Sequence, residues 1–242
     1  MIICAAQIRP LAGDIAYNLS LHQRYAVAAA AAGAGLVLFP ELSLTGYEPK
    51  LAGKLAFTGG EPELGLLEQA SGQHNIIIAV GLPLVAEEGT QIGLCFFIPG
   101  QGRIYYAKQL LHEDELPYFV AGTEDLLLEA GGERIAPAIC YESLQATHAE
   151  LAAARGATIY LASVAKSGRG VEQAPAHYSQ MAKRHKMQVL MANAVGSADD
   201  FLCAGNSAIW NAQGTVVAQL GPEAEGLLRY DTITGEAGIQ TL

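Results

Sequence analysis

A cysteine stands where one apolar segment of the chain turns polar. Residues 135–144 read IAPAICYESL, so Cys140 follows a run that predicts a buried strand and precedes a polar turn. A cysteine in a strand is usually a small core residue, whereas a reactive cysteine must be accessible and lie beside groups that lower its pKa. The polar residues after Cys140 favour the accessible position. We interpret Cys95 and Cys203, beside predicted hairpins, as structural.

Two charged residues also follow predicted strands. Glu41 comes after the strand LVLFP, and Lys108 comes after the strand IYYA. A carboxylate beside a thiol can take its proton during attack, and a lysine favours the thiolate and can donate to an oxyanion on a carbonyl. The backbone N–H of Tyr141 can be a second donor. Each residue alone would be read as an ordinary core or loop residue, but together they predict a nucleophile with a base and a charge stabiliser.

Histidines offer a different partner for the thiol. Those considered lie in segments predicted as loops or outer helices, where solvated histidines are common: His112, His148, His177 and His185. We therefore favour the glutamate and the lysine.

The elements that must position these residues occur twice in the chain. The similar pairs of segments are 93–107 with 205–219, 74–81 with 186–193, and 30–41 with 152–163. The first two pairs lie 112 positions apart, and the first of them shares a Gln-Gly turn. The third pair lies 123 positions apart. The order of the matching segments predicts a β-α-β-α-β-β unit in each half.

Two such halves predict an α/β fold in which two mixed sheets stack face to face, with helices outside both. This is a four-layer α-β-β-α sandwich built from similar halves, about residues 1–125 and 126–242. Apolar runs such as IIIAVGLP suit strands that are buried on both faces. No Ser- or Pro-rich linker separates the halves, so we expect a single domain over residues 1–242.

The candidate catalytic residues lie where the two halves differ. Cys140 ends the first strand of the second half, where the first half has Gln7, and Lys108 corresponds to Leu220. The segment that corresponds to the Glu41 loop reads LASVAKSG and contains no acid. Each chemical group therefore occurs once, which predicts one site on a duplicated scaffold.

These residues resemble the nitrilase-like carbon–nitrogen hydrolases over nearly the full chain. The resemblance rests on FPELSLTGY around Glu41, KQLL at Lys108 and ICYESL at Cys140, in that order. It implies the α-β-β-α sandwich, with Glu41 as general base, Lys108 as stabiliser of the oxyanion and Cys140 as nucleophile. It also implies a second glutamate near the site, which Glu115 matches best by its spacing, with Glu113 as the alternative.

The resemblance implies hydrolysis of a non-peptide C–N bond, the amide of a small molecule, without a cofactor or a metal. Nitrile-cleaving members follow the cysteine with Trp-Glu, and the Tyr141-Glu142 pair here is closer to amidases. The chain has VAKSGRG and AKRHKMQ where the family commonly has a tryptophan-containing segment and an Arg-Ala-x-Glu-Asn run. The alternatives are nitrile or N-carbamoyl hydrolysis, acyl transfer, or a non-catalytic binding domain.

Four residues are candidates for binding the substrate: Tyr47, Tyr141, Glu142 and Lys166. If a two-fold relates the halves, the segment SVAKSGRG meets the Glu41 loop, and Ser163, Lys166 and Arg169 then stand near the mouth of the pocket. Two cations on one short loop are a local exception in an acidic chain, and they can either balance surface acids or attract an acidic acyl group.

Composition limits the partners. The net charge of −10 argues against nucleic acid and anionic membranes, which both need a basic surface. The longest apolar run, YAVAAAAAGAGLVLFP, is broken by glycines and predicts a helix followed by a strand, and the N-terminus lacks the basic start of a signal peptide. The four cysteines form no CxxC pair, so we expect a reducing cytoplasm. We also expect a homodimer or higher homo-oligomer.

Overall fold

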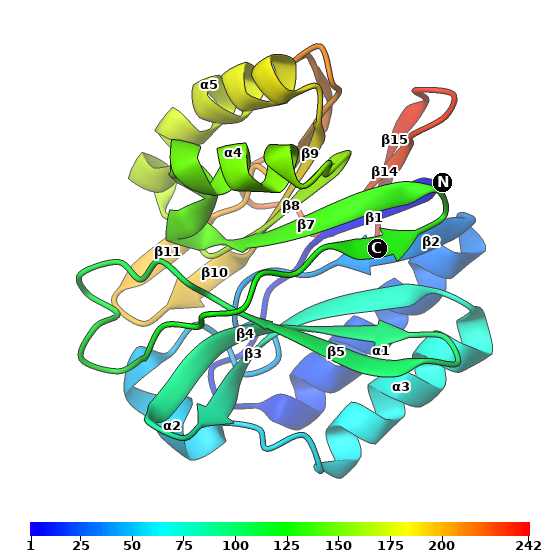
Figure 1. Ribbon diagram of the computed structural model, residues 1–242. Helices are drawn as coiled ribbons and strands as arrows, with labels where there is room; N and C mark the ends of the chain where they lie inside the picture. Colours follow the sequence, from blue (N-terminus) through cyan, green and yellow to red (C-terminus); the bar gives the residue numbers. More distant parts are fainter.

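The strands form two large sheets that stack face to face (Figure 1). The computed structural model describes all residues from 1 to 242. In chain order, the first sheet contains β1 (Ile2–Gln7), β2 (Ala34–Leu38), β3 (Ile77–Ala86), β4 (Gly89–Ile98), β5 (Gly102–Ala107), β14 (Gly226–Asp231) and β15 (Ala237–Thr241). The second sheet contains β6 (Leu128–Ala130), β7 (Glu133–Ile139), β8 (Ile159–Val164), β9 (Gln188–Asn193), β12 (Ala208–Trp210) and β13 (Val216–Gln219). A separate ribbon consists of β10 (Val195–Ala198) and β11 (Phe201–Ala204).

Helices cover the outer faces of both sheets. The first sheet is covered by α1 (Ile15–Ala31) and α3 (Pro62–His74), with the short α2 (Pro49–Leu55) at one end, and the second by α4 (Ala146–Ala154) and α5 (Gly168–His185). A single 3₁₀ turn, η1 (Cys140–Leu144), connects β7 to α4. The predicted four-layer α-β-β-α sandwich is confirmed (Figure 1).

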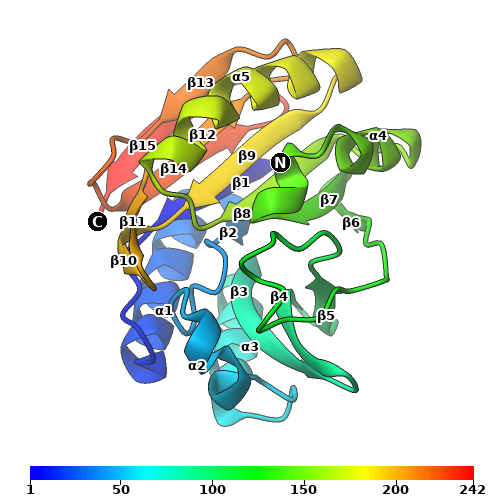
Figure 2. The same ribbon diagram turned by 90° about the vertical axis from the view of Figure 1, so that its left-hand side faces the viewer.

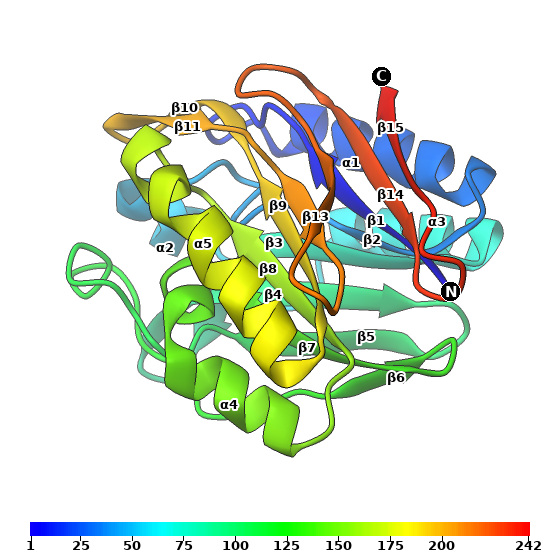
Figure 3. The same ribbon diagram turned by 90° about the horizontal axis from the view of Figure 1, so that it is seen from above.

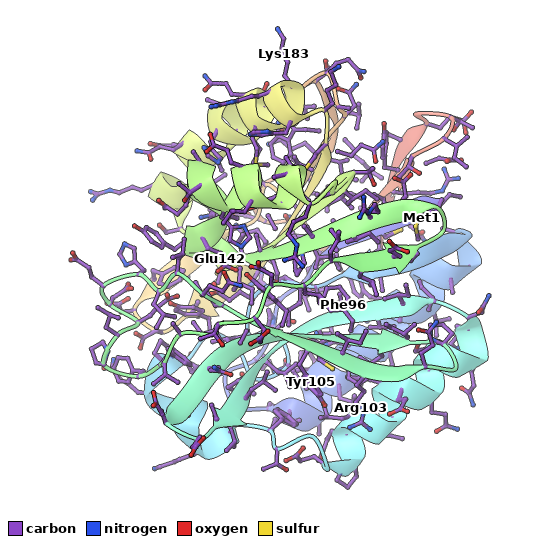
Figure 4. The ribbon with its side chains drawn as sticks, in the orientation of Figure 1. Met1, Phe96, Arg103, Tyr105, Glu142 and Lys183 are labelled. Atoms are coloured by element: carbon purple, nitrogen blue, oxygen red, sulfur yellow. The ribbon has the colours of Figure 1, made fainter.

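Three apolar clusters fill the spaces between the four layers. In β1, Ile3 contributes to the core between the sheets, while Cys4 packs in the core beneath α1 and α3. In β8, Leu161 contributes to the core between the sheets, while Tyr160 packs beneath α4 and α5. Phe96 lies between the layers in Figure 4. Because both faces of these strands are buried, their sequences are continuous apolar runs rather than alternating ones.

The two halves have the same order of elements and of strands. In the first half, β1-α1-β2-α3-β3 is followed by antiparallel β4 and β5, and in the second half β7-α4-β8-α5-β9 is followed by antiparallel β12 and β13. This repeated unit has seven elements, one strand more than the predicted β-α-β-α-β-β. The extra strand arises because the Gln-Gly turn joins two strands, β4 to β5 and β12 to β13, that both follow the third strand of the unit.

One strand of the second half joins the first sheet. After the hairpin of the first half, β6 pairs with β7 in the second sheet, and after the hairpin of the second half, β14 pairs with β1 in the first sheet; both pairs are antiparallel. Figure 3 shows β14 running along β1. The first sheet is therefore completed at one side by a segment that belongs, in sequence, to the second half.

The ends of β2 and β8 meet across the two sheets. Ser163 Oγ at the end of β8 donates a hydrogen bond of 2.8 Å to the carbonyl oxygen of Phe39, which follows β2. The expected meeting of the two strand-end loops is thereby confirmed. Their polar side chains can reach a common space.

The longest apolar run forms the end of α1 and the whole of β2, as predicted. Asp14 begins α1, since its side chain accepts a hydrogen bond from the Tyr17 N–H at 3.0 Å. Gly33, with a φ of 79°, makes the turn into β2. None of the helices has a stretch both long and apolar enough to cross a bilayer.

Candidate active site

Four charged or nucleophilic side chains come from the carboxyl ends of strands in the two stacked sheets. Glu41 lies just beyond β2, Lys108 directly follows β5, Cys140 directly follows β7 and Lys166 lies just beyond β8. Figure 2 shows the β10–β11 ribbon beside the start of α5 at this side of the molecule. Two strands from each half therefore supply the residues of one site.

A single lysine joins two buried glutamates. Lys108 Nζ donates to Glu41 Oε1 at 2.9 Å and to Glu115 Oε1 at 2.5 Å, and all three side chains are at most 2% exposed. Glu115 also accepts hydrogen bonds from the hydroxyl of Tyr47 at 3.2 Å and from the N–H of His112 at 2.8 Å. Glu115 is therefore the second glutamate beside the lysine.

Glu113 lies elsewhere. It is exposed on the same loop and takes no part in this cluster, although the sequence left it as an alternative to Glu115. The loop turns back between the two glutamates, so that one carboxylate points inward and the other toward solvent. The contact between Lys108 and Glu115 could not be derived from their separation in sequence.

The loop that holds Glu41 lies directly against β3. A Cβ atom at Gly81 would clash with the carbonyl oxygen of Pro40 and the backbone nitrogen of Leu42, so only glycine permits this approach. The Leu44 N–H then donates to the Gly81 carbonyl oxygen at 3.0 Å. These contacts hold the Glu41 backbone rigidly at the edge of the core.

Glu41 keeps one oxygen free. Its Oε1 accepts from Lys108, but Oε2 is buried and has no hydrogen-bond partner. Burial raises the pKa of Glu41 to about 7, against the lowering effect of the Lys108 ammonium. Burial alone would lower the pKa of Lys108, but the charges of Glu41, Cys140 and Glu115 hold it above its ordinary value. The pair is therefore an ammonium beside a carboxyl group that titrates near neutral pH.

Cys140 has an unusual backbone. Its φ is 46°, in the left-handed region that non-glycine residues rarely occupy, and η1 starts at this residue. Ser143 Oγ donates to the Cys140 carbonyl oxygen at 2.5 Å, and Cys140 Sγ lies 3.8 Å from the carbonyl oxygen of Ala165. The residue is half-buried, whereas Cys4, Cys95 and Cys203 are buried. A strained turn at a strand end thus holds the thiol at the surface of a pocket.

The thiol of Cys140 is not a ready thiolate, contrary to the expectation from sequence. Burial and the charge of Glu41 raise its pKa to about 11, and Lys166 and Lys108 offset only part of this. The lysines act in the expected direction, but they are outweighed. A thiol with a raised pKa is neutral near pH 7, so its attack on a substrate would need a base that takes the proton.

Glu142 lies beneath the site and does not line the pocket. Its carboxylate is fully buried and accepts hydrogen bonds from the Tyr106 hydroxyl (2.8 Å) and from the N–H groups of Ile139 (2.7 Å), Gln109 (2.8 Å) and Leu110 (3.2 Å). Figure 4 shows it in the interior, at the end of β7. With four protein donors it has no role in contacting a substrate. Instead, it ties the residues after Lys108 to the Cys140 turn.

A pocket of about 340 Å³ opens over the thiol. Of the residues expected to bind substrate, Tyr47, Tyr141 and Lys166 line it together with Cys140. Glu115 lines the pocket as well, and sequence reasoning did not foresee the remaining lining residues, which are His112, Asp114, Leu144, Ala165, Ser167, Gly170 and Phe201. The ring of Phe201, from the β10–β11 ribbon, stands edge-on to the Tyr47 ring at 5.7 Å.

The other two residues expected at the pocket mouth are elsewhere. Ser163 is buried and bonded to Phe39, and Arg169 is exposed outside the pocket lining. Lys166 is held by its backbone: its N–H donates to Asn193 Oδ1 at 2.8 Å, and its carbonyl oxygen accepts from Asn193 Nδ2 at 3.2 Å. The structure contains no group of three or more His, Cys, Asp and Glu side chains that could hold a metal ion.

The chain matches known proteins over nearly its whole length. The sequence model of the family described as carbon–nitrogen hydrolase matches residues 2–237. A probable nitrilase from Schizosaccharomyces pombe is 24% identical over 94% of this chain and 87% of its own length. A 2-oxoglutaramate amidase from Bacillus subtilis is 26% identical over 82% of this chain and 78% of its own length.

A solved structure has the same fold. The amidase from Nesterenkonia sp. AN1 superposes with a TM-score of 0.88 and 25% identity, covering 96% of this chain and 92% of that protein. Variants of that amidase have been solved in complex with butyramide and with the acetamide moiety of fluoroacetamide attached to the active-site cysteine.

Proposed function

The chain belongs to the carbon–nitrogen hydrolase family and is a hydrolase of amide-type bonds, and from this premise we propose that it cleaves the amide of a small molecule through a cysteine acyl-enzyme. The observation that carries the proposal is the buried Glu41 carboxylate, whose second oxygen is free beside the half-buried thiol of Cys140. Tyr47, Tyr141 and Lys166 form the walls that receive the substrate.

In the first step, Cys140 Sγ attacks the carbonyl carbon of the amide while its proton moves to Glu41. A carboxyl group with a pKa near 7 is matched to this transfer at neutral pH, because it is half deprotonated and still basic. The carbonyl oxygen becomes an oxyanion, which accepts hydrogen bonds from Lys108 Nζ and from the backbone N–H of Tyr141.

In the second step, the oxyanion collapses and the C–N bond breaks. Glu41 returns the proton to the leaving nitrogen, so ammonia or an amine departs and a thioester on Cys140 remains. Glu41 then takes a proton from water, and the resulting hydroxide attacks the thioester. The acid leaves, and the proton returns to the Cys140 sulfur.

Glu115 supports this sequence without leaving its place. It is bonded to Lys108, and it holds the ammonium when Glu41 becomes protonated. Tyr47 and the His112 N–H in turn hold Glu115. Because Lys108 is bonded to two carboxylates, Glu41 can gain and lose a proton while Glu115 keeps the Lys108 ammonium in place.

The compounds named for similar proteins include an uncharged amide and an amide that carries a carboxylate. Butyramide, bound by the Nesterenkonia amidase, carries no charge, whereas the name of the Bacillus enzyme denotes an amide that bears a carboxylate. The pocket of about 340 Å³ suits small acyl groups of either kind. A homodimer or higher homo-oligomer stays a prediction, which light scattering would check.

The test is ammonia release from a panel of small primary amides by the wild-type protein and by Cys140→Ser. We expect release with the wild type only, and a thioester adduct on Cys140 visible by mass spectrometry after rapid acid quenching. Adducts from a nitrile or an N-carbamoyl compound but from no amide would move the assignment to those reactions. Turnover by Cys140→Ser equal to wild type would refute the acyl-enzyme.

A further inference from the structure

Lys166 is a buried cation without a partner. It is only 6% exposed, it lines the pocket over Cys140, and its Nζ makes no hydrogen bond and has no carboxylate within 4.0 Å. Lys108, the other buried lysine of the site, has two carboxylates. A buried ammonium without a counter-ion is costly, so such a group indicates a ligand of opposite charge.

The helix that follows Lys166 offers further donors at the same place. The α5 helix begins at Gly168, its N-cap Ser167 makes no side-chain cap, and the N–H groups of Gly168, Arg169 and Gly170 donate to no protein group. Ser167 and Gly170 line the pocket beside Lys166. Free N–H groups and the positive end of the helix dipole favour an anion at this position.

The aliphatic stem of Lys166 runs along this first turn. A Cβ atom placed on Gly170 would lie 3.3 Å from Lys166 Cβ and 3.8 Å from its Cδ, so the stem packs directly against the helix. Figure 3 shows α5 starting beside the β10–β11 ribbon, whose Phe201 closes the other side of the pocket. The ammonium and the helix start therefore belong to one corner of the pocket.

The other charged groups of the pocket are already occupied. His112 Nδ1 and Asp114 Oδ1 are 2.6 Å apart, and Glu115 is saturated by Lys108, Tyr47 and the His112 N–H. Lys166 is thus the one unpaired charge that faces a substrate in the pocket. Cys140, Tyr178 and Glu41 raise its pKa against the lowering effect of burial, which keeps it an ammonium.

We propose that Lys166 and the first turn of α5 form a subsite for a carboxylate on the acyl part of the substrate, so that the preferred substrates are monoamides of short dicarboxylic acids. This inference rests on the proposed amide hydrolysis and names its substrate class. The carboxylate caps α5 and pairs with Lys166, while the amide group at the other end of the acyl chain reaches Cys140.

The test compares two amides of the same length, succinamate and butyramide, which differ by a carboxylate in place of a methyl group. We expect the ratio of kcat/KM values, succinamate over butyramide, to fall by about 10- to 100-fold in Lys166→Met, as when a hydrogen-bonded charge loses its partner. Lys166→Arg should restore most of the ratio. Lys183→Met, which removes an exposed cation from the last turn of α5, is the matched control and should leave the ratio at the wild-type value.

A role of Lys166 on the thiol alone would give a different result. In that case Lys166→Met lowers kcat/KM for both amides by the same factor and the ratio stays constant, which overturns the proposal. A fall of the ratio in Lys183→Met equal to that in Lys166→Met would overturn it as well, because the effect would then come from general surface charge.

A second readout needs no turnover. Iodoacetate and iodoacetamide alkylate the same thiol, but only iodoacetate carries a carboxylate. We expect Lys166→Met to reduce the ratio of their alkylation rates at Cys140 by about tenfold, and equal ratios in wild type and variant contradict the subsite. If the wild type hydrolyses no amide yet shows this ratio change, the proposed function fails while the anion subsite stands.

Discussion

Cys140 and Gln7 occupy the same place in their halves, at the carboxyl end of the first strand. Cys140 is half-buried and lines the pocket, whereas the side chain of Gln7 is buried and fully hydrogen-bonded. Gln7 is fully buried: its Nε2 donates to the carbonyl oxygens of Gly221 (2.7 Å) and Ala224 (2.6 Å), and its Oε1 accepts from the Ser207 N–H (2.8 Å). Cys140 makes a single weak contact through sulfur. The same strand end is thus a structural tie in one half and the position of the proposed nucleophile in the other.

The same contrast holds at the other strand ends. Leu220, which corresponds to Lys108, is an apolar residue of the core between the sheets, whereas Lys108 joins two glutamates. Glu41 and Lys166 follow equivalent strands with opposite charges, and each keeps a polar atom unpaired. The difference teaches that the candidate site lies where the fold leaves polar groups without hydrogen-bond partners. At the corresponding positions of the other half, the polar group is either fully hydrogen-bonded, as in Gln7, or replaced by an apolar residue, as in Leu220.

The largest effect should come from the nucleophile. Cys140→Ser should lower kcat at least about 10⁴-fold, because a serine hydroxyl is a much poorer nucleophile with the same base, and removing a nucleophile typically has effects of this order. Thermal unfolding should be nearly unchanged, since the side chain is half-buried and isosteric. Steady-state kinetics and a melting curve check both. Residual activity within tenfold of wild type would remove Cys140 from the comparison.

Glu41→Gln should lower kcat/KM by about 10²–10⁴-fold, because an amide of the same shape cannot accept the thiol proton. Glu113→Gln, on the exposed loop, is the matched control and should retain activity. In the wild type, kcat/KM should rise with pH through about 7, as Glu41 loses its proton, and this limb should vanish in Glu41→Gln.

Stability should respond to pH with the opposite sign. Burial raises the pKa of Glu41 above its unfolded value, so the folded protein binds a proton here that the unfolded chain releases. This contribution to stability is present at low pH and is lost as the pH rises from about 4.5 to about 7. The melting temperature of Glu41→Gln relative to wild type should therefore increase between pH 4.5 and pH 8. A constant difference across this range would contradict the raised pKa.

Lys108→Leu makes the first half resemble the second at this position. It should lower kcat/KM by about 10²–10³-fold, the typical effect of deleting one oxyanion donor. Glu41 and Glu115 would lose their counter-ion, so the variant should also be less stable at pH 8 than at pH 5, where the carboxyl groups can take up protons. Lys183→Ala, on α5 where Lys183 points into solvent (Figure 4), should change neither quantity.

The smallest effect on catalysis should come from Gln7, the residue that corresponds to Cys140 in the first half. Gln7→Leu removes three hydrogen bonds that the fully buried Gln7 amide makes with backbone groups, and it should lower the free energy of unfolding by about 1–3 kcal/mol. The kcat of the folded variant should stay within twofold of wild type. Denaturant titration and kinetics below the unfolding midpoint measure the two. A loss of kcat at constant stability would show that Gln7 acts on the site.

The fold and the set of Glu41, Lys108 and Cys140 could be predicted because their signals are local. Strands buried on both faces appear as apolar runs, and a polar residue that ends such a run stands out in one half when the other half lacks it. The equivalence of the halves then places the strand ends together before any contact is known.

The remaining features depend on contacts between distant segments. Phe201 lines the pocket only because the β10–β11 ribbon folds over it. Glu142 does not line the pocket, because its carboxylate accepts hydrogen bonds from donors on β5 and β7. The raised pKa of Cys140 also reflects burial by segments that are distant in sequence, which no short motif encodes. A position next to one of the motifs correctly predicts a place in the pocket lining for Tyr47, Tyr141 and Lys166. The same reasoning fails for Glu142, which directly follows Tyr141 but lies beneath the pocket.

The pairing of β14 with β1 constrains the order in which the chain can fold during synthesis on the ribosome. Gln7 of β1 pairs with Gly226 of β14, so one edge of β1 stays unpaired until nearly the whole protein has been made. Unpaired edges are sticky, and contacts this distant in sequence form slowly. Because β2, which precedes the Glu41 loop, pairs directly with β1, the strand before the proposed base belongs to a complete sheet only after Cys140 has been synthesised. Protection from proteolysis at the Glu41 loop should therefore appear late in translation, after Cys140 has left the exit tunnel.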